Sequence, residues 1–184
     1  TEGIAALDNV IGILDATGDM AYTATLNEKV DGATIIAGKD EVAAMALAQG
    51  CKAAMLPTAN FIPDLWKGIY TSITDNDLDS ARSMQMRIQK ICRITHTCPH
   101  HVVKAALWMM GRDMGMPAPP ALPGDNFLHE DWEELRHQLA GLGLLTAKDV
   151  RMTLGDRSWE SQVASIPATP DSVDMRMLIG EAYS

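Results

Sequence analysis

Short apolar runs alternate with amphipathic stretches over the first 74 residues of the chain. Each run ends at a turn-forming residue and predicts a buried strand, at residues 10–14, 33–37 and 53–56. Each amphipathic stretch predicts a helix, at residues 19–30, at residues 40–49 and from Pro63 onward. Strands separated by single helices are typical of right-handed βαβ units, so an α/β protein with a parallel sheet is predicted.

Beyond residue 74 the pattern predicts helices alone. Apolar positions at helical spacing mark residues 77–94, 99–110 and 129–140. A proline-rich connector at residues 116–124 separates the second of these helices from the third. The remaining segment differs in character, and a further helix is predicted from Asp171. We therefore divide the chain into residues 1–74, 75–145 and 146–184, the last being an extension without an assigned role.

Composition narrows the class of protein. The chain has 184 residues, of which 47% are hydrophobic, which is enough for the core of one domain. A formal net charge of -9 and the lack of a basic run argue against a nucleic-acid partner. No apolar stretch has the length of a membrane span. The three cysteines lack the spacing of a disulfide framework, so reduced thiols and a cytoplasmic location are expected.

Three short motifs carry a resemblance to a known family. Residues 9–19 read NVIGILDATGD, residues 35–40 read IIAGKD and residues 50–60 read GCKAAMLPTAN. In this order they resemble the sixth, seventh and eighth barrel strands of the dihydrodipicolinate synthase/N-acetylneuraminate lyase family. The likeness continues through the helical region to about residue 145, so the combination is more specific than any one motif.

The resemblance implies a fold and an activity. The fold would be the C-terminal part of a (β/α)8 TIM barrel, strands six to eight, followed by a C-terminal helical region. The activity would be that of a class I lyase or aldolase, which binds a 2-oxo acid such as pyruvate as a Schiff base and needs no cofactor. Gly38 and Met55 would stand at substrate-binding positions. The family's first barrel half, with its substrate-binding threonine pair and its relay tyrosine, has no counterpart in this chain.

Position 14 departs from the family pattern. The family has a lysine there whose amine attacks the ketone of the substrate, whereas this chain has Leu14. Leucine has neither a nucleophile nor a proton, although it can fill the space of the first part of a lysine side chain. We therefore expect no Schiff base at this position. Lys39 follows Gly38 at the end of the predicted seventh strand and is the candidate substitute amine. The alternative is that Lys39 is a solvated loop residue.

Two aspartates follow the first predicted strand. Asp15 and Asp19 flank Thr17 and Gly18, and a pair of carboxylates could serve acid–base chemistry. The position of Asp19 directly before a helical pattern favours a capping role for it. Asp15 is then expected to hold the turn.

A group of histidines and cysteines lies between two predicted helices. Cys92, His96, Cys98, His100 and His101 are residue types that bind zinc. Their spacing matches no common structural-zinc pattern. Ordinary loop and helix-cap roles are therefore preferred, and no metal site is expected.

Three interpretations of function remain open. The chain could belong to a class I lyase or aldolase in which Leu14 is a deliberate or natural replacement. It could instead be a non-catalytic relative that keeps the fold for binding or assembly. Three parallel strands leave two open edges, which favours pairing with a second copy or with a complementary N-terminal half. Because the chain begins at Thr1 within a predicted helix, a fragment is the third interpretation.

Overall fold

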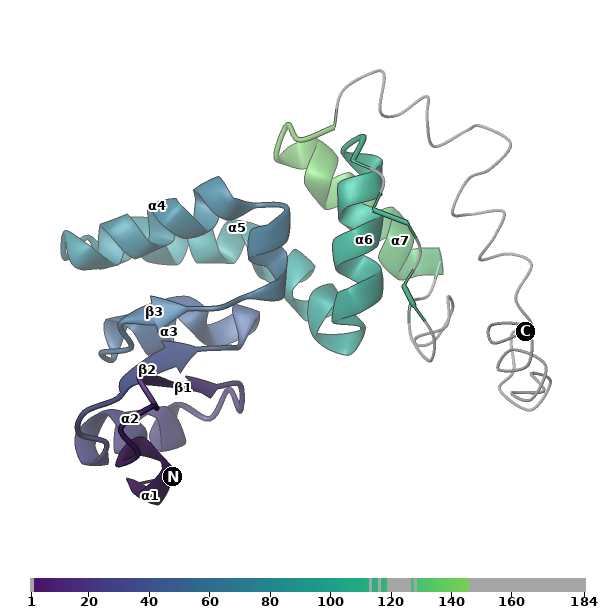
Figure 1. Ribbon diagram of the computed structural model, residues 1–184. Coiled ribbons are helices and arrows are strands. Elements are labelled where there is room, and N and C mark those ends of the chain that lie inside the picture. Colours follow the sequence, from purple (N-terminus) through teal and green to yellow (C-terminus); the bar gives the residue numbers. More distant parts are fainter. Residues whose placement is uncertain (1, 113, 116, 119–126, 128, 146–184) are drawn as a thin grey trace, which may run out of the picture.

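The computed structural model describes residues 2–112, 114–115, 117–118, 127 and 129–145. These residues form a small parallel sheet with its helices and, beside it, a group of longer helices (Figure 1). Most of the proline-rich connector at residues 116–124 lies outside the described residues. The segment 146–184, with the helix predicted from Asp171, lies outside them as well.

The elements follow the predicted order, with short 3₁₀ helices (η) added. They are α1 (Glu2–Ala5), β1 (Gly12–Asp15), α2 (Met20–Lys29), β2 (Thr34–Ala37), η1 (Asp40–Val42), α3 (Ala43–Ala48), β3 (Ala53–Ala54), η2 (Pro57–Asn60), α4 (Pro63–Thr74), α5 (Leu78–Thr97), α6 (Pro99–Met109) and α7 (His129–Gly141). The alternation of strands and helices, followed by helices alone, confirms the α/β class.

All strands of the sheet are parallel and lie in the order β1-β2-β3. Leu14 pairs with Ile36, and Ile36 pairs with Ala53. The predicted strand bounds were too wide, because β1 begins at Gly12 and β3 contains only two residues. β3 ends early because Pro57 has no N–H for a ladder and begins η2 instead.

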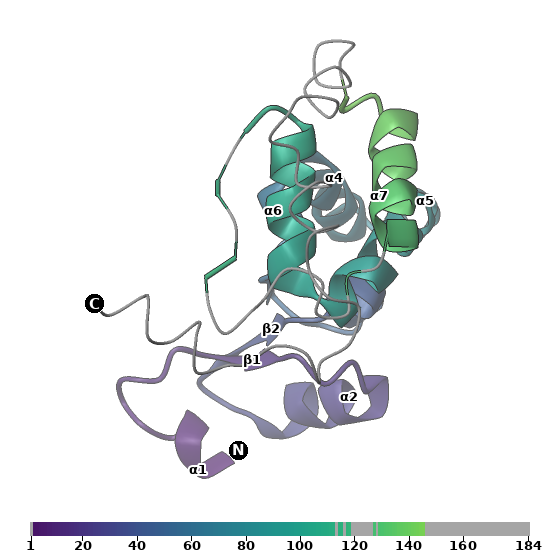
Figure 2. The same cartoon turned by 90° about the vertical axis from the view of Figure 1, so that its right-hand side faces the viewer.

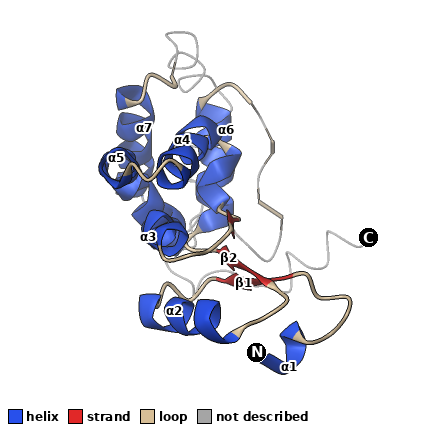
Figure 3. Cartoon of the chain, turned by 90° about the vertical axis from the view of Figure 1, so that its left-hand side faces the viewer, coloured by secondary structure: helices blue, strands red, loops and turns tan. Residues whose placement is uncertain are grey.

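Side chains alternate between the two faces of the sheet. Ile35 and Ala37 of β2 are buried in one cluster with Leu26 of α2 and Leu47 of α3. Figure 3 shows α2 and α3 beside strands β1 and β2. On the opposite face Leu14 remains 44% exposed. Parallel sheets normally have both faces covered, so this exposed face, the predicted barrel interior, is unusual.

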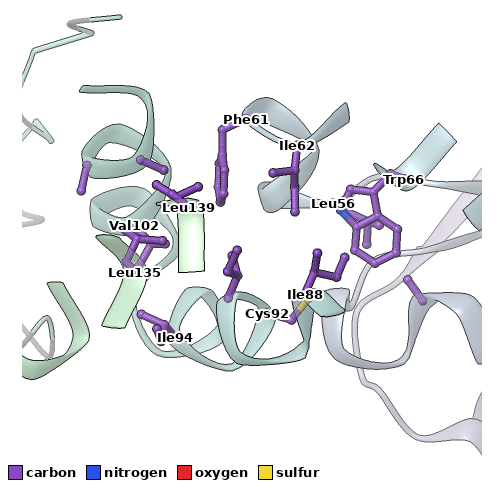
Figure 4. Close-up of a cluster of buried hydrophobic side chains, with 14 of the residues drawn as sticks. Leu56, Phe61, Ile62, Trp66, Ile88, Cys92, Ile94, Val102, Leu135 and Leu139 are labelled. Atoms are coloured by element: carbon purple, nitrogen blue, oxygen red, sulfur yellow. The ribbon is translucent and has the colours of Figure 1, made fainter. Parts of the chain in front are cut away.

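Helices α4 to α7 surround the larger hydrophobic core. Figure 2 shows α6 and α7 beside α4 and α5, and α5 contacts α4, α6 and α7. In the close-up of Figure 4, Phe61 and Trp66 lie across the core from Ile88 of α5, with Val102 and Leu139 further along. The core therefore joins α4 to the helices that follow it. None of the described helices combines the length and apolar character needed to cross a membrane.

The helix starts follow the signals that predicted them. The carboxylate of Asp19 accepts hydrogen bonds from the N–H groups of Ala21 at 2.9 Å and Tyr22 at 3.1 Å. Asp77 likewise accepts from the N–H of Ser80 at 3.0 Å at the start of α5. These contacts satisfy N–H groups that have no partner within the helix. The predicted capping role of Asp19 is confirmed.

Candidate functional site

The carboxyl ends of the three strands lie at one edge of the sheet. β1 ends at Asp15, β2 is followed by Gly38, and β3 continues through Met55 toward η2. The junction of α5 and α6 approaches the same edge, with His96 and Pro99 beside the turn after β2. In barrel proteins this edge is where active sites are built, so we take it as the candidate site.

Leu14 lies directly against Gly38 at this edge. A Cβ atom added to Gly38 would come within 2.8 Å of Leu14 Cδ1 and 3.0 Å of Leu14 Cγ. These separations are too short for carbon atoms, so the leucine side chain occupies the space beside the glycine. Met55, which follows β3, is 59% exposed. By strand alternation Met55 points to the same side of the sheet as Leu14.

Asp15 is buried at the end of β1 and organises the turn that follows. Its carboxylate accepts hydrogen bonds from the Thr17 N–H at 3.0 Å, the Thr17 hydroxyl at 2.6 Å and the Thr23 hydroxyl at 2.5 Å. Burial by itself would raise the pKa of Asp15, but the hydrogen bonds from Thr17 and Thr23 outweigh it and hold the pKa below its ordinary value. The predicted turn role is confirmed, and Asp15 is not paired with Asp19.

Asp40 is the second buried carboxylate of the site. It accepts hydrogen bonds from the Thr58 N–H at 3.2 Å and from the Thr58 hydroxyl, which in turn accepts from Trp66 Nε1 at 2.7 Å. Burial raises the pKa of Asp40, and the bonds from Thr58 offset this only in part. Gln85 Nε2 donates to the Asp40 carbonyl at 3.1 Å and ties α5 to the site.

The Asp40 network corrects one prediction. Residues 40–49 were expected to form one helix with Asp40 as its start. The Asp40 carboxylate instead bonds Thr58, no side chain caps η1, and the regular helix begins only at Ala43. Thr58 belongs to the Thr-Ala-Asn motif at residues 58–60, which was the available sequence signal. Its pairing with Asp40 was missed, because it depends on how the two strand ends meet.

Lys39 does not extend into solvent. Its Nζ lies 2.7 Å from Nδ1 and 3.0 Å from Nε2 of His96, and 3.6 Å from Glu41 Oε2. Its alkyl chain covers Gly18, where an added Cβ would meet Lys39 Cγ at 3.2 Å. Lys39 is thus a loop residue whose amine contacts His96 and Glu41 while its side chain remains 21% exposed. The sequence indicates His96 only as a possible zinc ligand, because its contact with Lys39 depends on how α5 packs against η1.

A cavity of about 190 Å³ opens beside this pair. Lys39, Asp40 and His96 line it together with buried Cys92 and Thr95. The volume is several times the roughly 30 Å³ that a water molecule occupies in the liquid. A small organic acid would therefore meet an amine, an imidazole and a buried carboxyl group here.

The histidines and cysteines around the junction of α5 and α6 do not converge on one point. Cys98 and His101 are buried, and the His101 ring packs 6.4 Å from the ring of Phe127. In the described part of the chain no three histidine, cysteine or acidic side chains are grouped so that they could hold a metal ion. The structure therefore gives the zinc interpretation no support.

Comparison with known proteins identifies relatives over most of the chain. A family model described as the dihydrodipicolinate synthetase family matches residues 1–138. A DapA-like lyase of Halobacterium salinarum, itself uncharacterized, is 29% identical over 143 residues, which cover 77% of this chain and 46% of the relative. A 4-hydroxy-tetrahydrodipicolinate synthase of Syntrophotalea carbinolica is 27% identical over 149 residues, which cover 78% of this chain and 49% of the relative.

Solved structures agree with these relatives. The chloride-inhibited dihydrodipicolinate synthase of Acinetobacter baumannii, complexed with pyruvate, is 26% identical and gives a TM-score of 0.70. The match covers 78% of this chain and 49% of that one. The dihydrodipicolinate synthase of Thermotoga maritima shares the fold at 23% identity, with a TM-score of 0.69. This match covers 77% of this chain and 48% of that one. The chain thus spans about half the length of the relatives that it matches.

Proposed function

The chain belongs to the dihydrodipicolinate synthetase family, and we propose that it forms the C-terminal half of a pyruvate-type class I lyase or aldolase whose Schiff-base position is blocked by Leu14. In this proposal β1 to β3 are barrel strands six to eight, and residues 75–145 are the C-terminal helical region. Gly38 and Met55 line the site of a 2-oxo acid such as pyruvate. No cofactor takes part.

The contact between Leu14 and Gly38 carries the proposal. The tip of the Leu14 side chain lies beside Gly38 at the carboxyl edge of the sheet. Leu14 is on the face of the sheet that the described residues leave exposed. A nucleophile at this point would reach a ligand over the strand ends. Leucine cannot form the iminium through which a class I enzyme stabilises a carbanion.

Reductive trapping tests whether the unaltered chain is unable to form a Schiff base with pyruvate. The protein is incubated with pyruvate and sodium borohydride, and adducts are located by peptide mass mapping. We expect every lysine to gain only the background label seen with borohydride and acetate. A specific, saturable adduct on one lysine would overturn the proposal.

Lys39 is the residue at which such an adduct would be informative. Its amine borders the 190 Å³ cavity and contacts His96, which could accept a proton from it. An adduct on Lys39 that is lost in Lys39→Arg, while Lys52→Arg leaves it unchanged, would show that this amine has replaced the missing one. Lys52 is the matched control because it lies at the opposite end of β3.

Assembly without catalysis is the second candidate function. The outer edges of β1 and β3 are unpaired among the described residues, and Ile11 beside β1 is 86% exposed. Unpaired edges and exposed apolar side chains favour association with another chain. A second copy or a complementary N-terminal half would cover both features. Light scattering should therefore give a mass above 19.9 kDa, and a stable folded monomer would count against this function.

We also propose a reducing, cytoplasmic setting for the protein. Cys51, Cys92 and Cys98 are all buried free thiols. Burial raises the pKa of Cys92 to about 12 and that of Cys98 to about 11. Such thiols are poor nucleophiles, which suits a structural role in the core. Detection of the protein in an oxidising compartment would contradict this location.

A further inference from the structure

An apolar groove of about 470 Å³ lies between α3 and α5 and shares Glu41 with the cavity of the candidate site. We call it the α3–α5 groove, and its apolar lining consists mainly of Val42, Met45, Ala48, Ile73, Leu78 and Met86. Met45 is 58% exposed, Leu78 52% and Met86 66%. Nothing in the described part of the chain covers these side chains. Three large exposed apolar residues around one groove indicate a binding surface.

Two arginines lie beside the groove, although the chain as a whole is acidic. Arg82 and Arg87 on the exposed side of α5 line a second hollow together with Asp79, and this hollow shares Arg82 and Met86 with the groove. The nearby acidic Glu41 lies 3.6 Å from Lys39 Nζ, and on α5 only Asp79 is acidic. A ligand with an apolar stripe and an acidic flank would therefore suit this surface.

The sequence near the end of the chain has this pattern. In residues 171–183, Met175, Leu178, Ile179 and Ala182 follow the i, i+3, i+4, i+7 spacing of one helix face. Asp174 and Glu181, seven residues apart, would lie together along one side of that face. Asp171 supplies an N-cap residue type at the start.

The connecting chain is long enough for this segment to reach the groove. The described part ends at Leu145, just beyond α7, and α7 packs against α5. Residues 146–170, fully extended, would span about 80 Å. A domain of this size has a radius of gyration of about 14 Å, so reach does not limit the contact.

We propose that residues 171–183 form an amphipathic helix that binds in the α3–α5 groove of its own chain. Met175, Leu178 and Ile179 cover Met45, Leu78 and Met86. Asp174 and Glu181 lie toward Arg82 and Arg87. The extension thereby closes an apolar surface on the outside of the helices, and it takes no part in the chemistry of the strand ends.

Disulfide trapping in the full-length chain tests this docking. The variant Met86→Cys with Leu178→Cys places one thiol in the groove and one in the segment. In the control, Ala140→Cys with Leu178→Cys, the first thiol lies on the exposed side of α7, closer to the segment along the chain. The native thiols are buried, so they compete poorly. We expect the 86–178 disulfide to form within single chains at least tenfold faster than the 140–178 disulfide.

Two changes separate docking from chance collision. Ile179→Asp, which places a charge on the apolar stripe, should reduce the 86–178 rate to that of the control. Replacing both arginines, Arg82→Glu with Arg87→Glu, should slow it severalfold at low salt. Equal rates for the two pairs would overturn the proposal. Disulfides found only between two chains would overturn it too, because the groove would then hold a segment of a second copy.

Discussion

Asp15 and Asp40 are both buried carboxylates at the strand ends, yet their surroundings move their pKa values in opposite directions. Asp15 accepts three hydrogen bonds from Thr17 and Thr23, which favour the ionised form. Asp40 is desolvated more strongly, and the hydrogen bonds from Thr58 and from its own backbone N–H offset this only in part. The difference predicts opposite effects of pH on the stability that each residue contributes.

Asp15→Asn should lower the free energy of unfolding by about 1–3 kcal/mol at pH 7, because an amide cannot accept every hydrogen bond that the carboxylate accepts. A lowered pKa means that the stabilisation is present above the ordinary value of 3.8 and is lost as the pH falls through the lowered pKa. Urea unfolding between pH 3 and 7 should therefore show the variant approaching the wild type at acid pH. A gap that widens at low pH would contradict this account.

Asp40→Asn should behave in the reverse way. The raised pKa means that the contribution of Asp40 is fully present below 3.8 and is lost as the pH rises through the raised pKa. The asparagine keeps an acceptor for Thr58, so the variant should be at least as stable as the wild type at pH 7 and gain nothing at pH 3. The exposed Asp31→Asn is the control, expected within about 0.5 kcal/mol of the wild type. A loss above about 1.5 kcal/mol for Asp40→Asn at pH 7 would show that its charge is needed.

At the level of elements, the sequence predicted those strands and helix starts that depend on residues close together in the chain. Apolar runs marked all three strands, and Asp19 and Pro63 marked the starts of α2 and α4. The 3₁₀ start at Asp40 could not be predicted, because it depends on Thr58, eighteen residues away. The same holds for the contact of Lys39 with His96 on α5, which only the packing of α5 against η1 brings about.

The close packing of β1 on β2 at Leu14 and Gly38 can be tested by a double-mutant cycle. Gly38→Ala alone should cost about 1–3 kcal/mol, because its Cβ would lie 2.8 Å from Leu14 Cδ1. In a Leu14→Ala background the same change should cost clearly less, since the two leucine atoms are gone and only the Asp15 carbonyl oxygen, 3.1 Å from the added Cβ, remains close. Gly3→Ala, with no atom within 4 Å of the added Cβ, is the control and should not destabilise. Additive effects measured by denaturant unfolding would show that the contact is not tight.

At the scale of the whole molecule, the order of motifs predicted the family and the α/β class, while the proposed function rests on one side chain. The chain matches its family over residues 1–138 but spans about half of its relatives. Its sheet accordingly has an exposed face on which Leu14 lies. The division at residues 74 and 145 remains a prediction. Residues that select the substrate could not be predicted, since the chain spans only about half the length of its relatives.

The central claim is that position 14 is the Schiff-base position, blocked by leucine. Leu14→Lys, incubated with pyruvate and borohydride and mapped by peptide mass, tests this most directly. We predict a saturable pyruvate adduct on residue 14, well above the label on exposed Lys52 in the same sample. Leu14→Arg, which adds charge without a reactive amine, should gain no adduct. Label on residue 14 no greater than that on Lys52 would contradict the account.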